Sequence, residues 1–255
     1  MVGWVREGAW VDRFRLLSCH ASSAMGAVWR AEEAGTAHPV ALKLTTRGAA
    51  AAARALQGIR HPHVVRVLAV GEADDHDFLA MDWVEGRPLT TWLQEAPAWR
   101  EVLEVLCQAG AGLGAAHRAG VVHGDFKPDN VLVDGAGAAR VIDFGGAPRA
   151  CGQTAGYLAP ERSFGAPADP LSDQFAYCCA AYEALFGRLP FASRDERLFG
   201  APAAPPEGPA ATLFAPLRRG LQADPGLRYR DLDGLLADMA NVCAPAPIGH
   251  PGHRS

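Results

Sequence analysis

The segment GVVHGDFKPDN, residues 120–130, places an Asp, a Lys and an Asn within six positions behind a short apolar run. Transfer of a phosphoryl group needs a metal-held polyphosphate, neutralisation of its charge, an aligned nucleophile and a carboxylate that orients the nucleophile. Asp125 could orient a hydroxyl group, and Lys127 could neutralise the moving group. Asn130 and the later Asp143 carry oxygen donors of the hard type that Mg²⁺ prefers. Either Asp alone also fits a turn or a helix cap, so the evidence lies in the combination.

The composition is typical of a globular protein of one large domain or two small lobes. The chain has 255 residues, of which 49% are apolar and 20% are charged. Its net charge of −4 argues against a nucleic-acid-binding surface. No apolar stretch approaches the roughly 18 residues of a membrane helix, and the first residues lack the pattern of a signal peptide. We therefore expect no nucleic-acid partner and no membrane span.

Six cysteines occur without any CxxC pair, at positions 19, 107, 151, 178, 179 and 243. Buried free thiols are the simplest interpretation, with a metal or disulfide role as the alternative. Free thiols are typical of a reducing compartment, so we expect a cytoplasmic protein.

The secondary-structure elements that must position these candidate catalytic residues fall into two groups along the chain. Residues 13–46 contain strand-like pieces, the Ala-rich stretch 47–59 favours a helix, and two further strands follow. From Leu89 onward the pattern is mainly helical. The segments that carry these later patterns are helices over 100–120, 172–187 and 231–242, a strand–turn–strand unit over 130–145, and a proline-rich loop over 201–210.

Six motifs carry a family resemblance. VALKL, VHGDFKPDN and VIDFG are similar to a lysine-bearing strand, a catalytic loop and a metal-binding strand end. TAGYLAPER is similar to the end of an activation segment, and SDQFAYCCAAYEALFG to the helix whose Asp, here Asp173, braces the catalytic loop. DPGLRYRDLDGLL is similar to the late segment whose Arg228 pairs with Glu161. In this order, from residue 13 to about 240, the motifs resemble the eukaryotic-like protein kinase family, in its bacterial serine/threonine branch.

The resemblance implies an α+β, bilobal protein-kinase-like fold. A small β-rich N-lobe with one helix, helix C, would precede a larger, mainly helical C-lobe. The expected bounds are 13–243 for the kinase domain, about 13–84 for the N-lobe, 82–86 for the hinge, about 87–243 for the C-lobe, and 1–12 and 244–255 for the tails.

The resemblance also implies sites for ATP and Mg²⁺. Lys43 would contact the phosphates, Met81 would be the gatekeeper, and the hinge would bind adenine through backbone groups. The residues implied for these sites are Asp82, Trp83 and Val84 in the hinge, Val28, Ala41 and Leu132 around the base, Asn130 and Asp143 for the metal, and Asp125 and Lys127 for catalysis. Plain core packing is the alternative for the residues around the base.

Two departures from the family pattern favour a second interpretation, a pseudokinase scaffold or regulator. In the glycine-rich loop, Ala21 and Ser23 replace glycines and only Gly26 remains. The helix C carboxylate that pairs with Lys43 is also missing, because the expected position is Ala52. Lys43 must then be oriented by Asp143, by the phosphates, or not at all. All the catalytic residues are present, so we expect an active enzyme of low rate.

Gly124 raises a third interpretation, since small-molecule kinases of the aminoglycoside and choline type often carry His-Gly-Asp here. They usually lack the KPDN continuation and the Ala-Pro-Glu anchor with its matching Arg, so we expect a protein substrate with a Ser or Thr acceptor. Gly124 also lacks the side chain that would grip an activation-loop phosphate. Control by loop phosphorylation is therefore not expected, and a regulatory protein partner stays open.

Overall fold

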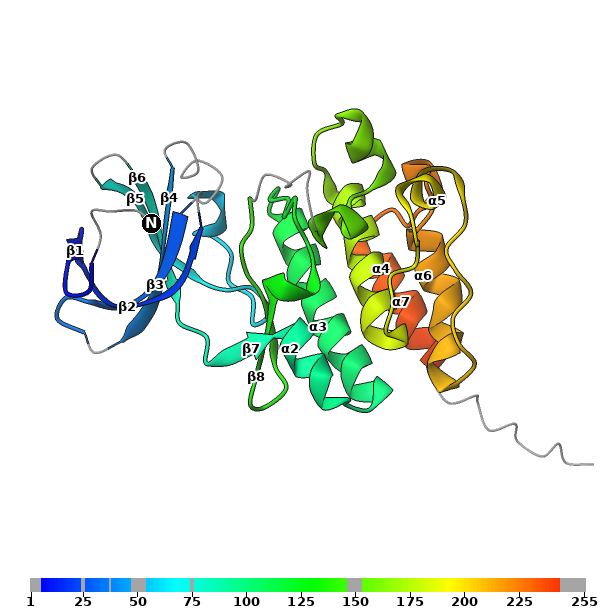
Figure 1. Cartoon of the computed structure of the whole chain (residues 1–255), viewed down its shortest axis with the longest axis horizontal. Coiled ribbons are helices and arrows are strands. Elements are labelled where there is room, and N and C mark those ends of the chain that lie inside the picture. The colour runs from blue at the N-terminus through cyan, green and yellow to red at the C-terminus, as the bar shows by residue number, and fades with distance from the viewer. Residues whose placement is uncertain are drawn as a thin grey trace, which may run out of the picture.

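The structure is a computed structural model that describes residues 6–23, 26–36, 38–46, 54–73, 76–145 and 153–243. A β-rich lobe and a mainly helical lobe lie next to each other and are joined by the chain that follows β6 (Figure 1). The predicted α+β, two-lobed architecture is confirmed.

The N-lobe is built on a six-stranded antiparallel sheet with the order β1-β2-β3-β4-β6-β5. Its strands are β1 (Trp10–Val11), β2 (Phe14–Ser23), β3 (Gly26–Glu33), β4 (Pro39–Thr46), β5 (Val67–Ala73) and β6 (His76–Asp82). Buried and less buried side chains alternate along β3, as expected for a sheet with one face on a core. Phe14 and Phe78 meet edge to face in that core, with ring centroids 6.0 Å apart.

The N-lobe sheet begins before residue 13, the predicted start of the domain. Trp10 and Val11 form β1, which pairs with Arg15 and Phe14 of β2 through a tight turn. Val11 is buried in the N-lobe core, and this apolar contact holds the edge strand on the sheet. The N-lobe therefore includes residues that the sequence assigned to a tail.

The segment 61–65 connects the two lobes. Its backbone bonds to β9 (Ala139–Val141), since Val141 N–H donates to the His63 carbonyl at 2.9 Å and Val65 N–H donates to the Val141 carbonyl at 3.0 Å. Helix α3 (Trp99–Arg118) approaches this segment so closely that a Cβ added to Gly112 would lie 2.2 Å from the His63 carbonyl oxygen. Only glycine fits there, so this contact fixes the N-lobe on the C-lobe.

The helix predicted over 47–59 is described only near its end, where residues 54–56 are helical. Ala52 lies outside the described residues. The strand–turn–strand unit is confirmed, since β7 (Gly86–Pro88), β8 (Val131–Asp134) and β9 form a small antiparallel sheet. Because β7 begins at Gly86, the last residue of the predicted hinge already belongs to the C-lobe sheet.

The six described α-helices of the C-lobe are α2 (Leu89–Trp92), α3 (Trp99–Arg118), α4 (Pro170–Phe186), α5 (Arg194–Phe199), α6 (Phe214–Gly220) and α7 (Leu232–Cys243). Three of the six, α3, α4 and α7, match helices that the sequence predicted, and the other three were not predicted. The nearly all-apolar α4 is the central helix, and its middle is buried on every side. It begins at a capping box in which Asp169 accepts a hydrogen bond from the Ser172 amide, and it ends at Gly187 with φ of 73°.

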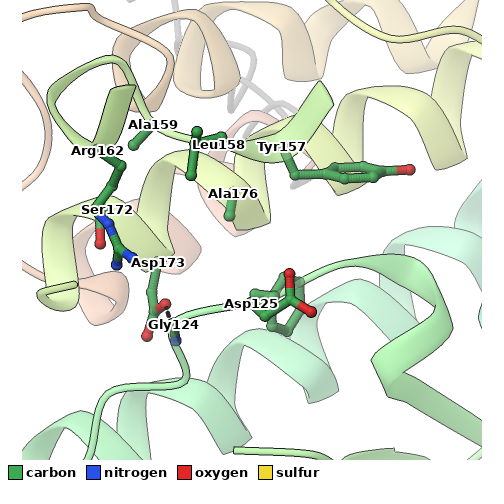
Figure 2. A pocket seen from close by; sticks show the side chains of 10 residues that line it. Gly124, Asp125, Tyr157, Leu158, Ala159, Arg162, Ser172, Asp173 and Ala176 are labelled. Carbon is green, nitrogen blue, oxygen red and sulfur yellow. Dashed lines mark hydrogen bonds between the residues drawn. The ribbon is translucent and has the colours of Figure 1, made fainter. Parts of the chain in front are cut away.

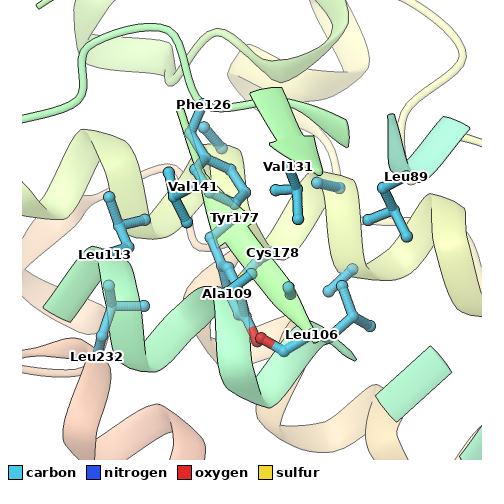
Figure 3. Close-up of a cluster of buried hydrophobic side chains, with 14 of the residues drawn as sticks. Leu89, Leu106, Ala109, Leu113, Phe126, Val131, Val141, Tyr177, Cys178 and Leu232 are labelled. Atoms are coloured by element: carbon cyan, nitrogen blue, oxygen red, sulfur yellow. The ribbon is translucent and has the colours of Figure 1, made fainter. Parts of the chain in front are cut away.

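The C-lobe core lies directly behind the catalytic loop. Figure 3 shows Phe126 and Val131 packed with Tyr177 and Leu106, which come from α4 and α3. The Phe126 and Tyr177 rings are 5.8 Å apart, and the buried Tyr177 hydroxyl donates to the Leu106 carbonyl at 2.9 Å. The apolar side chain of Phe126 thus anchors the loop on the C-lobe core.

Four cysteine thiols lie within the described residues, and none of these four is in a disulfide. Cys178 and Cys179 are buried on α4, and burial raises the pKa of both thiols. Cys19 is exposed on β2, so the prediction of burial is wrong for that residue. Among the described helices, none is both long and apolar enough to cross a bilayer.

Candidate active site

The catalytic loop is held by the buried carboxylate of Asp173, which comes from the first turn of α4. Its Oδ2 accepts the His123 amide at 2.7 Å. Its Oδ1 accepts the Gly124 amide at 2.8 Å (Figure 2). The His117 ring also meets Oδ2 through Nε2 at 2.8 Å. These partners offset the cost of burying the carboxylate. The bracing role implied by the resemblance therefore matches the geometry.

The His123 side chain links the catalytic loop to the segment that follows β9. Its Nε2 lies 2.9 Å from the Ile142 carbonyl and must carry the proton, while Nδ1 accepts the Asp125 amide at 3.3 Å. Burial lowers the pKa of His123, with Asp173 acting in the opposite direction. The ring is therefore neutral, and its tautomer is set by these two bonds.

Asp125 presents one occupied and one unoccupied carboxylate oxygen. Oδ2 lies 3.0 Å from the Lys127 Nζ. Oδ1 is buried and has no hydrogen-bond partner among the described residues. Asn130 is the last residue of the 3₁₀ turn Pro128–Asn130, and its Nδ2 donates to the Asp125 backbone carbonyl at 2.8 Å. An unpaired buried acceptor is costly unless a ligand supplies a donor.

Lys43 is oriented by Asp143. Nζ of Lys43, on β4, lies 3.0 Å from Oδ1 of Asp143, and both side chains are about a third exposed, at 28% and 33%. Asp143 adopts a φ of 61°, a left-handed conformation that costs free energy for a non-glycine residue. The Ile142 amide donates to the Asn130 carbonyl, and the Gly145 amide donates to the His123 carbonyl, so both sides of Asp143 are tied to the catalytic loop. Orientation by Asp143 is one of the alternatives that the sequence left open for Lys43, and this ion pair agrees with it.

The predicted nucleotide-binding residues line up on the strands of the N-lobe. Val28 on β3 pairs with Lys43, and Ala41 on β4 pairs with Met81 on β6. Met81 is buried, as expected for a residue behind the base, while Val28 and Ala41 are half-buried. Leu132 lies on β8 opposite Pro88, and it is also half-buried.

The loop between β2 and β3 keeps its glycine for a steric reason. Gly26 has a φ of 148°, and an added Cβ would lie 2.0 Å from the Leu44 carbonyl oxygen. Ala21 pairs with Val28 and Ser23 pairs with Gly26, so the hairpin forms without the other two glycines. The one glycine that survives in the sequence is the one that the backbone requires.

The hinge is fixed by contacts of its own. The Asp82 amide donates to the Arg66 carbonyl at 3.0 Å, and the Val84 carbonyl accepts the Gly86 amide at 2.9 Å. Trp83 donates through Nε1 to Glu85 and meets the His20 ring at a centroid distance of 5.4 Å. The His20 contact links β2 to the hinge, and no sequence motif indicated it.

The end of the activation segment is anchored to the C-lobe. Glu161 forms a bidentate ion pair with Arg228, with N–O distances of 2.7 and 2.8 Å. The Tyr157 hydroxyl bonds to Glu183 on α4, and this bond together with burial raises the pKa of Tyr157. The side chain of Thr154 lies outside the described part of the structure.

A pocket opens beside Asp125. Figure 2 shows it between the catalytic loop and the end of the activation segment, with the Asp125 carboxylate, Tyr157, Leu158 and Arg162 on its walls. An acceptor side chain that entered here would lie beside the Asp125 carboxylate. Asp125, Lys127 and Asn130 thus interact within the catalytic loop, and Lys43 of the N-lobe pairs with Asp143 next to that loop.

Comparison with known families decides the identity. Residues 23–201 match the family model described as "Protein kinase domain". The chain belongs to the protein kinase family. This kinase domain is 35% identical over 206 residues to the serine/threonine-protein kinase pkn2 of Myxococcus xanthus, covering 70% of this chain and 25% of that protein. It is 31% identical over 278 aligned residues to the serine/threonine-protein kinase PknA of Mycobacterium tuberculosis, covering 94% of this chain and 64% of that protein.

The kinase fold is also matched in three dimensions. The crystal structure of the Mycobacterium tuberculosis PknI kinase domain superposes with a TM-score of 0.77 at 25% identity, covering 93% of this chain and 99% of that chain. The chain spans only part of the two curated relatives named above, a quarter of one and 64% of the other. Family and fold thus agree with the resemblance that the sequence motifs carried.

Proposed function

We propose that this kinase domain is catalytically active and transfers the γ-phosphoryl group of ATP to Ser or Thr hydroxyls of a protein. The observation that carries the proposal is the unpaired, buried Oδ1 of Asp125 beside an open pocket. A substrate hydroxyl is the kind of donor that would satisfy this oxygen. Asp125 would align the hydroxyl for attack and accept its proton as the new bond forms.

Lys127 and Lys43 would manage charge. The Lys127 ammonium lies 3.0 Å from Asp125, so it holds that carboxylate in place and can neutralise the phosphoryl oxygens. Lys43 reaches the cleft with its ammonium on Asp143. A lysine so placed binds phosphate as a point charge.

The residues present fit a magnesium-bound nucleotide. Among the described residues, no three His, Cys, Asp or Glu side chains gather into a closed metal cage. Mg²⁺ is commonly held by one or two protein oxygens together with substrate phosphates, and Asn130 and Asp143 supply such oxygens next to the lysines. The bound metal would neutralise charge that develops on the transferred group.

The alternative is a pseudokinase, as suggested by the missing helix C carboxylate. The ion pair between Lys43 and Asp143 favours the active enzyme, because it orients the lysine without that carboxylate. The pair also occupies one oxygen of Asp143, which supports the expectation of a low rate. Location in the cytoplasm and binding of a regulatory protein stay predictions.

The function is tested by supplying labelled ATP and Mg²⁺ with three kinds of acceptor. These are a generic basic protein rich in Ser and Thr, an aminoglycoside, and choline. We expect stabilisation of the fold by millimolar Mg–ATP and label on Ser or Thr of the protein only. Nucleotide binding without any transfer would favour the pseudokinase, and label on a small alcohol would overturn the choice of acceptor.

A further inference from the structure

Arg197 on α5 is a buried charge with no ion-pair partner among the described residues. The residue is only 7% exposed, although arginine is seldom buried without a carboxylate. Nη1 donates to the Ala155 backbone carbonyl, while Nε is buried and has no hydrogen-bond partner. Burial lowers the pKa of Arg197, and Arg194 acts in the same direction. The protein thus bears a desolvation cost for one bond to the activation segment.

That bond lies close to the catalytic pocket. Ala155 belongs to the 3₁₀ turn Gln153–Tyr157, and Tyr157 and Leu158 line the pocket together with Asp125. The turn is tightly packed, since a Cβ added to Gly156 would lie 2.7 Å from Cδ1 of Leu189. Arg197 holds the turn from α5, and Glu183 holds Tyr157 from α4. The wall that faces the substrate is therefore fixed from two helices.

A phosphate on the activation segment cannot hold the turn Gln153–Tyr157 by pairing with an arginine next to Asp125. Loop phosphates order a kinase by pairing with arginines. The residue before Asp125 is Gly124, which has no side chain and a φ of 78°. In the described residues, unmodified C-lobe side chains hold the end of the activation segment. They are those of Glu183, Arg197 and Arg228.

We propose that Arg197 is a positioning residue that holds the end of the activation segment in its substrate-binding shape without phosphorylation. This inference rests on the proposed kinase activity. It adds how the pocket wall formed by Tyr157 and Leu158 is held in position for a protein substrate. Arg197 touches neither the nucleotide residues nor Asp125 in the described contacts, so its effect would pass through Ala155.

The test compares Arg197→Met and Arg197→Lys with the control Arg194→Met, an exposed arginine on the same helix. For Arg197→Met we expect the KM for a protein acceptor to rise about 10-fold or more, with the KM for ATP unchanged, because a displaced wall loses acceptor alignment. The lysine keeps charge and one donor, so Arg197→Lys should restore part of the loss. The control should match the wild type.

Two further measurements separate positioning from a merely structural role. Arg197→Met removes a buried unpaired charge, so its Tm should stay equal to that of the wild type or rise. Amide hydrogen exchange over 153–159 should become about 10-fold faster in Arg197→Met and not in the control. A lowered Tm with exchange faster throughout the C-lobe would overturn the proposal, as would unchanged exchange and unchanged kinetics.

The outcomes also distinguish this inference from the proposed function. If the wild type transfers no phosphate, the kinase activity fails, and the exchange over 153–159 still decides whether Arg197 holds the segment. If a phosphatase-treated wild type keeps its rate, phosphate is dispensable as proposed. If that treatment removes most of the activity, a phosphate rather than Arg197 orders the segment, and the inference is wrong.

Discussion

Replacing Glu161 by Gln should destabilise the C-lobe more than any change at an exposed ion pair. The side chain of Arg228 is completely buried, and its guanidinium makes five hydrogen bonds. Two of them go to Glu161, which supplies the negative charge, and three go to backbone carbonyls. Glu161→Gln keeps the shape of the side chain and removes the charge, so the guanidinium is left buried and uncompensated.

The expected cost is about 3–5 kcal/mol, the typical penalty for breaking a buried ion pair. For a chain of this size, about 2–4 °C of Tm accompanies each kcal/mol, so Tm should fall by roughly 6–20 °C. Urea denaturation gives the free energy and a thermal scan gives Tm. The matched control is Asp233→Asn, since Asp233 pairs with Arg118 at 2.7 Å while both side chains are more than half exposed. That exposed pair should be worth less than about 1 kcal/mol.

A double variant sharpens the test. Arg228→Met combined with Glu161→Met removes both charges, and it should be less destabilised than Glu161→Met alone because no charge remains unpaired. A loss in Glu161→Gln as small as that in Asp233→Asn would refute the reasoning. Equal losses in the double and single variants would show that packing, not charge, holds this corner.

Three further predictions concern the site and its support. Lys43→Met should change the unfolding free energy by less than about 1 kcal/mol, because its pair with Asp143 is partly exposed, yet it should lower phosphoryl transfer at least 100-fold in a steady-state assay. Burial lowers the pKa of His123 from its ordinary 6.5, so the unfolded chain takes up the proton first as pH falls below 6.5. Stability should then fall by up to about 1.4 kcal/mol per pH unit, and urea midpoints at pH 6.5 and 5.5 should differ less in His123→Gln. Tyr177→Phe leaves the buried Leu106 carbonyl without this donor and should cost about 1–3 kcal/mol by urea denaturation, with the KM for ATP unchanged.

The sequence indicated the candidate catalytic residues because they are clustered in short motifs with chemical meaning. Asp125, Lys127 and Asn130 lie within six positions, and such local spacing survives any arrangement of the lobes. The helix α4 was also predictable, since an apolar run with no polar face has to be buried. Asp173 was assigned as the brace of the loop through the family resemblance, and the structure bears that assignment out.

Contacts between segments far apart in the sequence could not be predicted, because they depend on how the chain folds and not on local spacing. The bond from Arg197 to Ala155 spans 42 positions and ends on a backbone carbonyl, which leaves no mark in the sequence. The orientation of Lys43 depends on how β4 sits over the strand end at Asp143, so the sequence could only state alternatives. The short strand β1 was taken for a tail because two residues carry no periodicity, and tertiary pairing decided it.

The central claim is that Asp125 aligns a protein hydroxyl for transfer, and one comparison tests it most directly. Wild type, Asp125→Asn and the control Asp129→Asn are assayed with labelled ATP and a Ser/Thr protein acceptor, and Mg–ATP binding is followed by thermal shift. Asp129 is an exposed carboxylate in the same loop, bonded to Thr90. We predict loss of transfer of about 100-fold or more in Asp125→Asn alone, with nucleotide binding retained in all three. Equal transfer by the wild type and Asp125→Asn would contradict the account.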